Sequence, residues 1–164
     1  MMNLRPLGRL LVWVVLFGAC GNGEAPPATP PAPTPVPTVS SKPALPSVPF
    51  DTLKMLYERS NYIDYLFYDL PVSMSQNNQQ DVRGALAHIS SDVPVRPAAC
   101  QPIGQVFYEV DGTTRLRANL YFSPGCMYLE FLENDQPAYA NKLMPDGVAF
   151  FNNLLQRLGK PTVE

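Results

Sequence analysis

The 164-residue chain is poor in the residues that most enzymes use for chemistry, with one histidine, His88, and three cysteines. No GxSxG or HExxH motif is present. A histidine that acts as a base needs a nucleophile beside it and a carboxylate behind it, and no local pattern around His88 supplies either. We therefore expect His88 to be a partly exposed helix residue, and we expect the protein to be non-catalytic.

The chain also lacks a convincing pair of catalytic carboxylates. Asp64 and Asp69 are the candidates for a glycosidase pair. On one helix, their offset of five residues would separate them by about 140° and point them to different faces. Solvated or capping roles explain them better, which leaves an enzyme as the least supported class.

Basic runs are missing as well. Residues 50–164 hold nine Lys and Arg against thirteen Asp and Glu, a net charge of −4. This balance excludes a typical nucleic-acid interface and a membrane face held by electrostatic attraction.

No hydrophobic run is long enough to predict a transmembrane anchor. The N-terminus has a basic start with Arg5 and Arg9 and then a short apolar core, Leu10 to Phe17, whereas a spanning helix needs about 20 residues. Residues 1–19 are instead typical of a signal peptide, which plays no part in the fold.

The segment Phe17-Gly18-Ala19-Cys20 resembles the lipobox of bacterial lipoproteins, although Phe17 stands where leucine is usual. The resemblance implies that Cys20 receives a diacylglycerol and becomes the first residue of the mature chain. Two or more acyl chains give stable anchoring, whereas one binds a membrane only marginally. The alternative is an ordinary secretory signal with an incidental cysteine.

Gly21 bears on the membrane to which the protein is attached. An aspartate directly after the lipidated cysteine resembles an inner-membrane retention signal, and this chain has glycine at that position. We therefore expect a lipid anchor in the outer membrane of the cell envelope, with the domain in the periplasm or at the surface.

Residues 20–49 form the second predicted region, a proline-rich linker. Gly21 to Pro49 contains ten prolines and no aromatic residue, so it has little apolar surface to bury. Extended at about 3.1 Å per residue, it would hold the domain up to roughly 80–90 Å from the membrane. We expect this linker to be disordered and to contribute nothing to the fold; the alternative is a ligand for a proline-recognising module.

Residues 50–164 predict one domain of the α+β class. A helix starts at Asp51 or Thr52 and continues from Ser60 to Leu70, with Ile63, Phe67 and Leu70 on one face. A second helix covers residues 79–90, and a C-terminal helix starts after Pro145 with Asp146 as its cap.

Four strands are expected between these helices. The segments GQVFYEV, RLRANLYF and CMYLEFLE and the residues 138–143 are separated by turn signals at 111–112, 123–125 and 134–135. The prediction is a four-stranded antiparallel meander with two preceding helices and one C-terminal helix.

Cys100 and Cys126 are the cysteines that remain beside a lipidated Cys20. In a meander, the first and third strands begin at the same end of the sheet, about 10 Å apart, and these two cysteines precede and start those strands. In an exported protein this arrangement predicts a disulfide. A thiophilic metal held by both cysteines and His88 is the weaker alternative, since no CxxC spacing is present. We expect no cofactor.

The most distinctive segment is residues 61–80, which contains Tyr62, Tyr65 and Tyr68. On a helix, these tyrosines would flank the apolar stripe and could form a patch where a protein or a glycan stacks. The alternative is a purely structural role, in which their rings complete the core.

Two functional hypotheses follow. The first is a non-catalytic lipoprotein domain that binds an envelope protein as an accessory or assembly factor. A free sheet edge or a flat apolar face would support it. The second is a small binding module for cell-wall glycan, peptide or metal. An exposed aromatic cluster over a groove would support it.

Overall fold

The structure, a computed structural model, describes residues 40–160 and Val163. These residues form an α+β domain with three helices and six strands. In chain order the elements are α1 (Phe50–Arg59), β1 (Tyr62–Phe67), β2 (Ser73–Gln76), α2 (Gln79–Ala87), β3 (Gly104–Val110), β4 (Thr113–Ser123), β5 (Cys126–Glu133), β6 (Gln136–Lys142) and α3 (Pro145–Arg157).

The α+β class agrees with the sequence analysis, but the four-stranded meander is wrong. All six strands belong to one sheet in the order β2-β1-β3-β4-β5-β6, and every neighbouring pair is antiparallel. The expected meander is β3 to β6, and the β1–β2 hairpin extends it on the β3 side.

The main error lies in residues 60–70, which form no helix. Ile63, Tyr65 and Phe67 are buried and alternate with more exposed residues in β1. Ile63 and Phe67 are four residues apart, a spacing that fits both the helical period of 3.6 and the strand period of 2. The aromatic and β-branched residues of YIDYLF favour a strand, and pairing with β3 provides partners for its backbone.

The helices α2 and α3 lie close to their predicted positions, whereas α1 ends at Arg59 and not at Leu70. In α2, the Asn78 side chain accepts a hydrogen bond from the Asp81 N–H at 2.9 Å, and the helix ends at Ala87 instead of residue 90. In α3, Met144 occupies the N-cap position and Asp146 lies in the first turn, where its charge is favourable next to the helix dipole.

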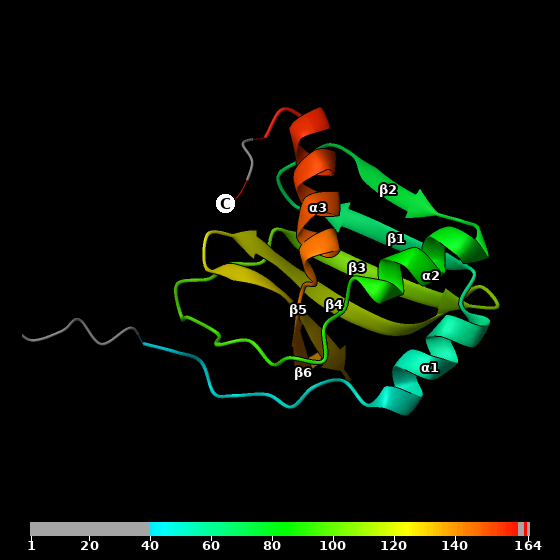
Figure 1. Ribbon diagram of the computed structural model, residues 1–164, viewed down its shortest axis with the longest axis horizontal. Coiled ribbons are helices and arrows are strands. Elements are labelled where there is room, and N and C mark those ends of the chain that lie inside the picture. The colour runs from blue at the N-terminus through cyan, green and yellow to red at the C-terminus, as the bar shows by residue number, and fades with distance from the viewer. Residues whose placement is uncertain (1–39, 161–162, 164) are drawn as a thin grey trace, which may run out of the picture. The chain divides into compact units, whose positions relative to one another are not determined.

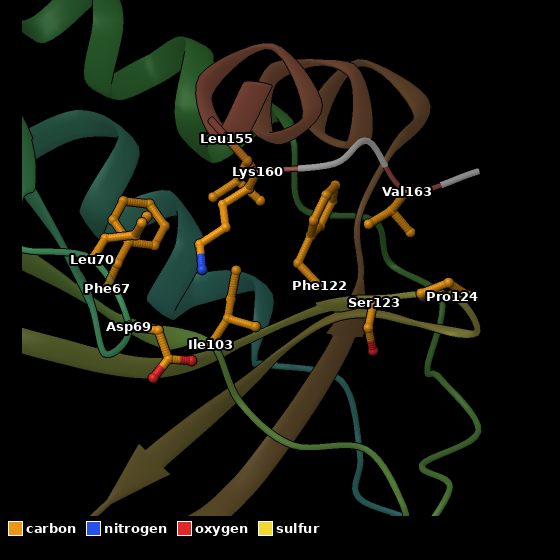
Figure 2. Close-up of a pocket in the computed structure, with 10 residues that line it drawn as sticks. All are labelled: Phe67, Asp69, Leu70, Ile103, Phe122, Ser123, Pro124, Leu155, Lys160 and Val163. Atoms are coloured by element: carbon orange, nitrogen blue, oxygen red, sulfur yellow. The ribbon is translucent and has the colours of Figure 1, made fainter. Parts of the chain in front are cut away.

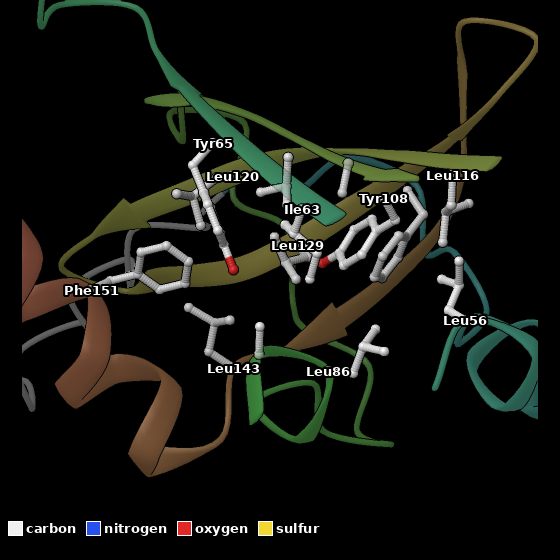
Figure 3. Packing of buried hydrophobic residues seen from close by; sticks show 14 of the residues in the cluster. Leu56, Ile63, Tyr65, Leu86, Tyr108, Leu116, Leu120, Leu129, Leu143 and Phe151 are labelled. Atoms are coloured by element: carbon white, nitrogen blue, oxygen red, sulfur yellow. The ribbon is translucent and has the colours of Figure 1, made fainter. Parts of the chain in front are cut away.

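All three helices pack against one face of the sheet (Figure 1). Figure 3 shows sheet residues such as Ile63, Leu120 and Leu129 opposite Leu86 of α2 and Phe151 of α3. The largest side chains of the core include Tyr108 and Phe131, whose rings lie 6.3 Å apart. The helices therefore share a single core with the sheet.

Residues 40–49 also belong to the domain, which corrects the expectation that nothing before Phe50 contributes to the fold. The Lys42 N–H donates to the Arg96 carbonyl at 2.7 Å, and Val48 is 3% exposed within the core cluster. In Figure 1, this segment runs past β6 before it enters α1.

The prolines of this segment take part through their carbonyl groups. Pro46 accepts from the Ala140 N–H at 2.9 Å, and Pro49 accepts from the first amides of α1. Pro43 accepts from the Arg96 guanidinium at 2.6 Å. A proline cannot donate, but it accepts as other residues do, so a proline-rich composition alone does not exclude an ordered segment.

Candidate functional site

The three tyrosines of the expected patch do not form a cluster. Because they lie on or after a strand, Tyr62 and Tyr65 point to opposite faces of the sheet. Tyr65 is 3% exposed, and burial raises the pKa of its hydroxyl far above the ordinary value. Tyr62 donates to Ser75 Oγ at 2.8 Å, and Tyr68 follows β1 with 49% of its surface exposed. A stacking patch made of these three rings is therefore absent.

Cys100 and Cys126 form a disulfide with a Cα–Cα distance of 5.9 Å, as the sequence predicts. They lie beside Tyr121 and Tyr128 in a second small cluster on the sheet face opposite the helices, where the two rings stack with centroids 4.4 Å apart. The bond joins the loop before β3 to the start of β5.

A buried ion pair between Arg96 and Glu130 lies near the disulfide. The two side chains are 6% and 3% exposed. Glu130 also accepts hydrogen bonds from Asn119 at 3.2 Å and from the Tyr121 hydroxyl at 3.3 Å. These contacts fix the loop that carries Arg96, together with Pro43, onto the sheet, so we assign the pair a structural role.

Burial and the charge of Glu130 raise the pKa of Tyr128 to about 12. Its hydroxyl is buried without a hydrogen-bond partner among the described residues. The nearby Arg96 guanidinium acts in the opposite direction but does not outweigh burial and Glu130, so the phenol stays neutral at physiological pH.

His88 and the two aspartates are not brought together. His88 caps the C-terminus of α2, its ring lies 5.3 Å from that of Phe150, and burial lowers its pKa despite the nearby Asp146. Asp64 accepts from Ser75 at 2.8 Å, whereas Asp69 lies in the β1–β2 turn. Within residues 40–160 and Val163, no group of three or more His, Cys, Asp or Glu could hold a metal ion.

The β6 edge of the sheet is covered. Its outward amides at Ala140 and Lys142 donate to the carbonyls of Pro46 at 2.9 Å and Asp92 at 2.8 Å. The Ser90 N–H in turn donates to the Lys142 carbonyl at 2.9 Å. Two separate segments therefore occupy the outward hydrogen-bonding groups at the C-terminal end of this edge, at Ala140 and Lys142.

The β2 edge is different. Along an antiparallel strand, the backbone N–H and C=O groups of successive residues point alternately to the two neighbouring strands. The Tyr68 N–H donates to the Ile103 carbonyl just before β3. The backbone groups of even-numbered β1 residues therefore point to β3, and those of odd-numbered residues point to β2. In β2, the residues opposite the odd-numbered ones are Met74 and Gln76, which bond to β1.

It follows that Ser73 and Ser75 direct their backbone N–H and C=O groups away from the sheet. Among the residues that the structure describes, none pairs with this side of β2. The Ser75 hydroxyl is already bonded to Tyr62 and Asp64 on the sheet face, which holds the strand in place. No sequence pattern indicated this strand, because SMSQ is short and polar.

No protein family, curated protein or solved structure matches the chain at a significant level. In the part of the chain that the structure describes, no helix has the length and apolar character needed to span a membrane. Functional inference therefore depends on the geometry of the domain and on the N-terminal sequence; Cys20 and residues 1–39 lie outside the described residues.

Proposed function

We propose that the chain is a non-catalytic lipoprotein of the bacterial cell envelope, anchored in the outer membrane through Cys20, whose domain binds a protein partner as an accessory or assembly factor. The partner adds a strand to the open edge of β2. The observation that carries this proposal is the contrast between the two edges of the sheet, one covered by Pro46 and Asp92 and the other open at Ser73 and Ser75.

An open edge is a liability for a soluble domain, and proteins commonly protect it with lysine, proline or a covering segment. β2 contains neither lysine nor proline. Two outward residues supply up to about four backbone hydrogen bonds to an added strand. Because β2 is short, side-chain contacts with the exposed Val72 and Tyr68 beside it would add to the affinity.

A binding module for cell-wall glycan, peptide or metal has less support. That hypothesis depended on an exposed cluster of Tyr62, Tyr65 and Tyr68, and the alternation of β1 buries Tyr65.

The test is site-specific photo-crosslinking in intact cells with a photoreactive residue at Ser73. We expect a discrete adduct from Ser73 and none from the exposed Arg115 on β4. Ser75→Pro removes an outward N–H but no ladder hydrogen bond, so the domain should fold and the adduct should disappear. Ser75→Ala removes only the hydroxyl and should keep the adduct.

An adduct by itself is not decisive, because any neighbour in the envelope can be captured. Strand addition is contradicted if the adduct persists in Ser75→Pro, or if Ser75→Ala abolishes it equally. Circular dichroism of the purified variants shows that the proline has not unfolded the sheet.

A further inference from the structure

A cavity of about 340 Å³ lies between the C-terminal part of α3 and the end of the sheet where β1 finishes (Figure 2). Its walls are mainly apolar and include Phe67, Leu70, Ile103, Phe122, Leu155 and Val163. This volume falls in the range of ligand sites in proteins, about 300–1,000 Å³.

One wall of the cavity is held in place by a specific contact. The Asn152 side chain donates to the Val163 carbonyl and accepts from the Val163 N–H, both at 2.8 Å. This two-bond contact holds Val163 against α3. Val163 therefore closes the cavity on the side opposite the β1–β2 turn (Figure 2).

Three polar residues also line the cavity, but only one directs its polar group inward. Figure 2 shows the Lys160 ammonium directed between Leu70 and Ile103, whereas the Asp69 carboxylate and the Ser123 hydroxyl point away from it. Lys160 forms no ion pair with any described residue. The cavity thus combines apolar walls with a single cation at its mouth.

We propose that this cavity binds a medium-chain carboxylate, with the hydrocarbon chain between Phe67, Ile103 and Leu155 and the carboxylate at Lys160. A water-sized group takes about 30 Å³, so 340 Å³ accommodates on the order of ten such groups, comparable to a chain of about ten carbons. Burial of methylenes supplies the affinity, and the ammonium selects an anionic head over a neutral one.

This ligand site goes beyond the proposed partner binding and does not depend on it. The competing occupant is an apolar side chain of a protein partner, which would fill the same walls but would not need Lys160. A carboxylate and its neutral alcohol separate the two explanations, since they share the chain and differ only in the head group.

The experiment is a titration of the full chain carrying Cys20→Ser with decanoate and with decanol, followed by methyl NMR. Decanoate should shift the methyl signals of Ile103, Leu155 and Val163 in a saturable manner. Lys160→Ala should weaken decanoate binding about three- to fivefold, as expected for one exposed ion pair, and should leave decanol binding unchanged. Lys54→Ala, an exposed lysine on α1, is the matched control and should change neither.

A second variant tests the location independently of charge. Leu70→Trp replaces a branched alkyl side chain by a larger indole ring in the turn that borders the cavity, so it should abolish the shifts with both ligands. The proposal is overturned if decanoate produces no saturable shift of these methyl groups, if Leu70→Trp leaves them unchanged, or if Lys160→Ala weakens decanol and decanoate equally.

Discussion

Single residues decide how the N-terminal segment is attached to the sheet. Arg96 donates to the carbonyl of Pro43 and pairs with Glu130 of β5, so one guanidinium joins the segment, a loop and a strand. A buried charge keeps such a position only while its partner is present, because the unpaired ion loses its hydration without compensation. The contribution of Arg96 to the fold therefore depends on Glu130.

Replacement of one partner should be strongly destabilising. We expect Arg96→Met to lower the free energy of unfolding by about 3–5 kcal/mol, because it leaves the Glu130 carboxylate buried without its cation. Urea denaturation measures the change. Arg117→Met is the control, since Arg117 pairs with an exposed Asp135, and removal of an exposed pair costs at most about 1 kcal/mol. Equal losses in the two variants would contradict the structural role of Arg96.

At the scale of elements, the two edge strands are treated differently. β6 is bordered by residues that are far away in the sequence, namely Pro46 before α1 and Asp92 after α2. β2 ends the sheet, and its side away from β1 has no neighbour among the described residues. The cover over β6 depends on residues 40–49, which also bury Val48 and engage Asn141 of β6 at 2.9 Å.

Removal of this cover should weaken the whole domain. A chain that begins at Phe50 loses the buried Val48 and leaves the Ala140 N–H without its acceptor. A chain that begins at Ser40 keeps Val48 buried and the Ala140 N–H hydrogen-bonded to Pro46. Burial of a valine side chain contributes about 1.5–3 kcal/mol and each hydrogen bond about 1 kcal/mol. We expect the melting temperature of the Phe50 chain to lie more than about 5 °C below that of the Ser40 chain.

Thermal melting followed by circular dichroism measures this difference. If both chains melted within about 2 °C of each other, residues 40–49 would contribute little to stability. The cover over β6 would then be unimportant, and the contrast between a covered β6 edge and an open β2 edge would no longer support binding at β2. The Val48→Ala variant of the longer chain separates the apolar contribution from the backbone hydrogen bonds.

For the whole molecule, the ordered segment shortens the spacer that the proposed lipoprotein would have between its anchor and its domain. Because residues 40–49 belong to the domain, the expected spacer shortens to residues 21–39. At about 3.1 Å per residue its reach would be about 60 Å, compared with 80–90 Å for the longer linker. A partner in the envelope would therefore meet β2 closer to the membrane.

The anchor itself is testable at Cys20. Cys20→Ser removes the thiol that would carry the diacylglycerol, so we expect it to abolish incorporation of radiolabelled palmitate and to release the protein from the membrane fraction. Cys126→Ser serves as the control, because Cys126 is bonded to Cys100 and should not affect labelling. Lipid incorporation by the Cys20→Ser chain would contradict the lipoprotein assignment.

Much of the meander could be predicted because its signals are local. Period-two alternation in β3 and β4 and the turn at Asp111 and Gly112, both with positive φ, depend only on neighbouring residues. The disulfide followed from the same meander, since antiparallel order brings the starts of β3 and β5 to one end. β1 could not be recognised in this way, because the spacing of Ile63 and Phe67 fits a helix as well as a strand and the burial of Tyr65 between them is decided by tertiary packing.

Short-range patterns and residue types were enough to predict the α+β class, the strands β3 to β6 and the pairing of Cys100 with Cys126. The lipobox-like start depends on the same kind of local pattern and stays a prediction. Long-range packing, by contrast, buries Tyr65, makes the prolines before α1 hydrogen-bond acceptors and leaves the outer side of β2 without a partner among the described residues. Whether a backbone group is free depends on which distant segment lies beside it, and long-range pairing of this kind leaves no local trace in residues such as Ser73 and Pro46.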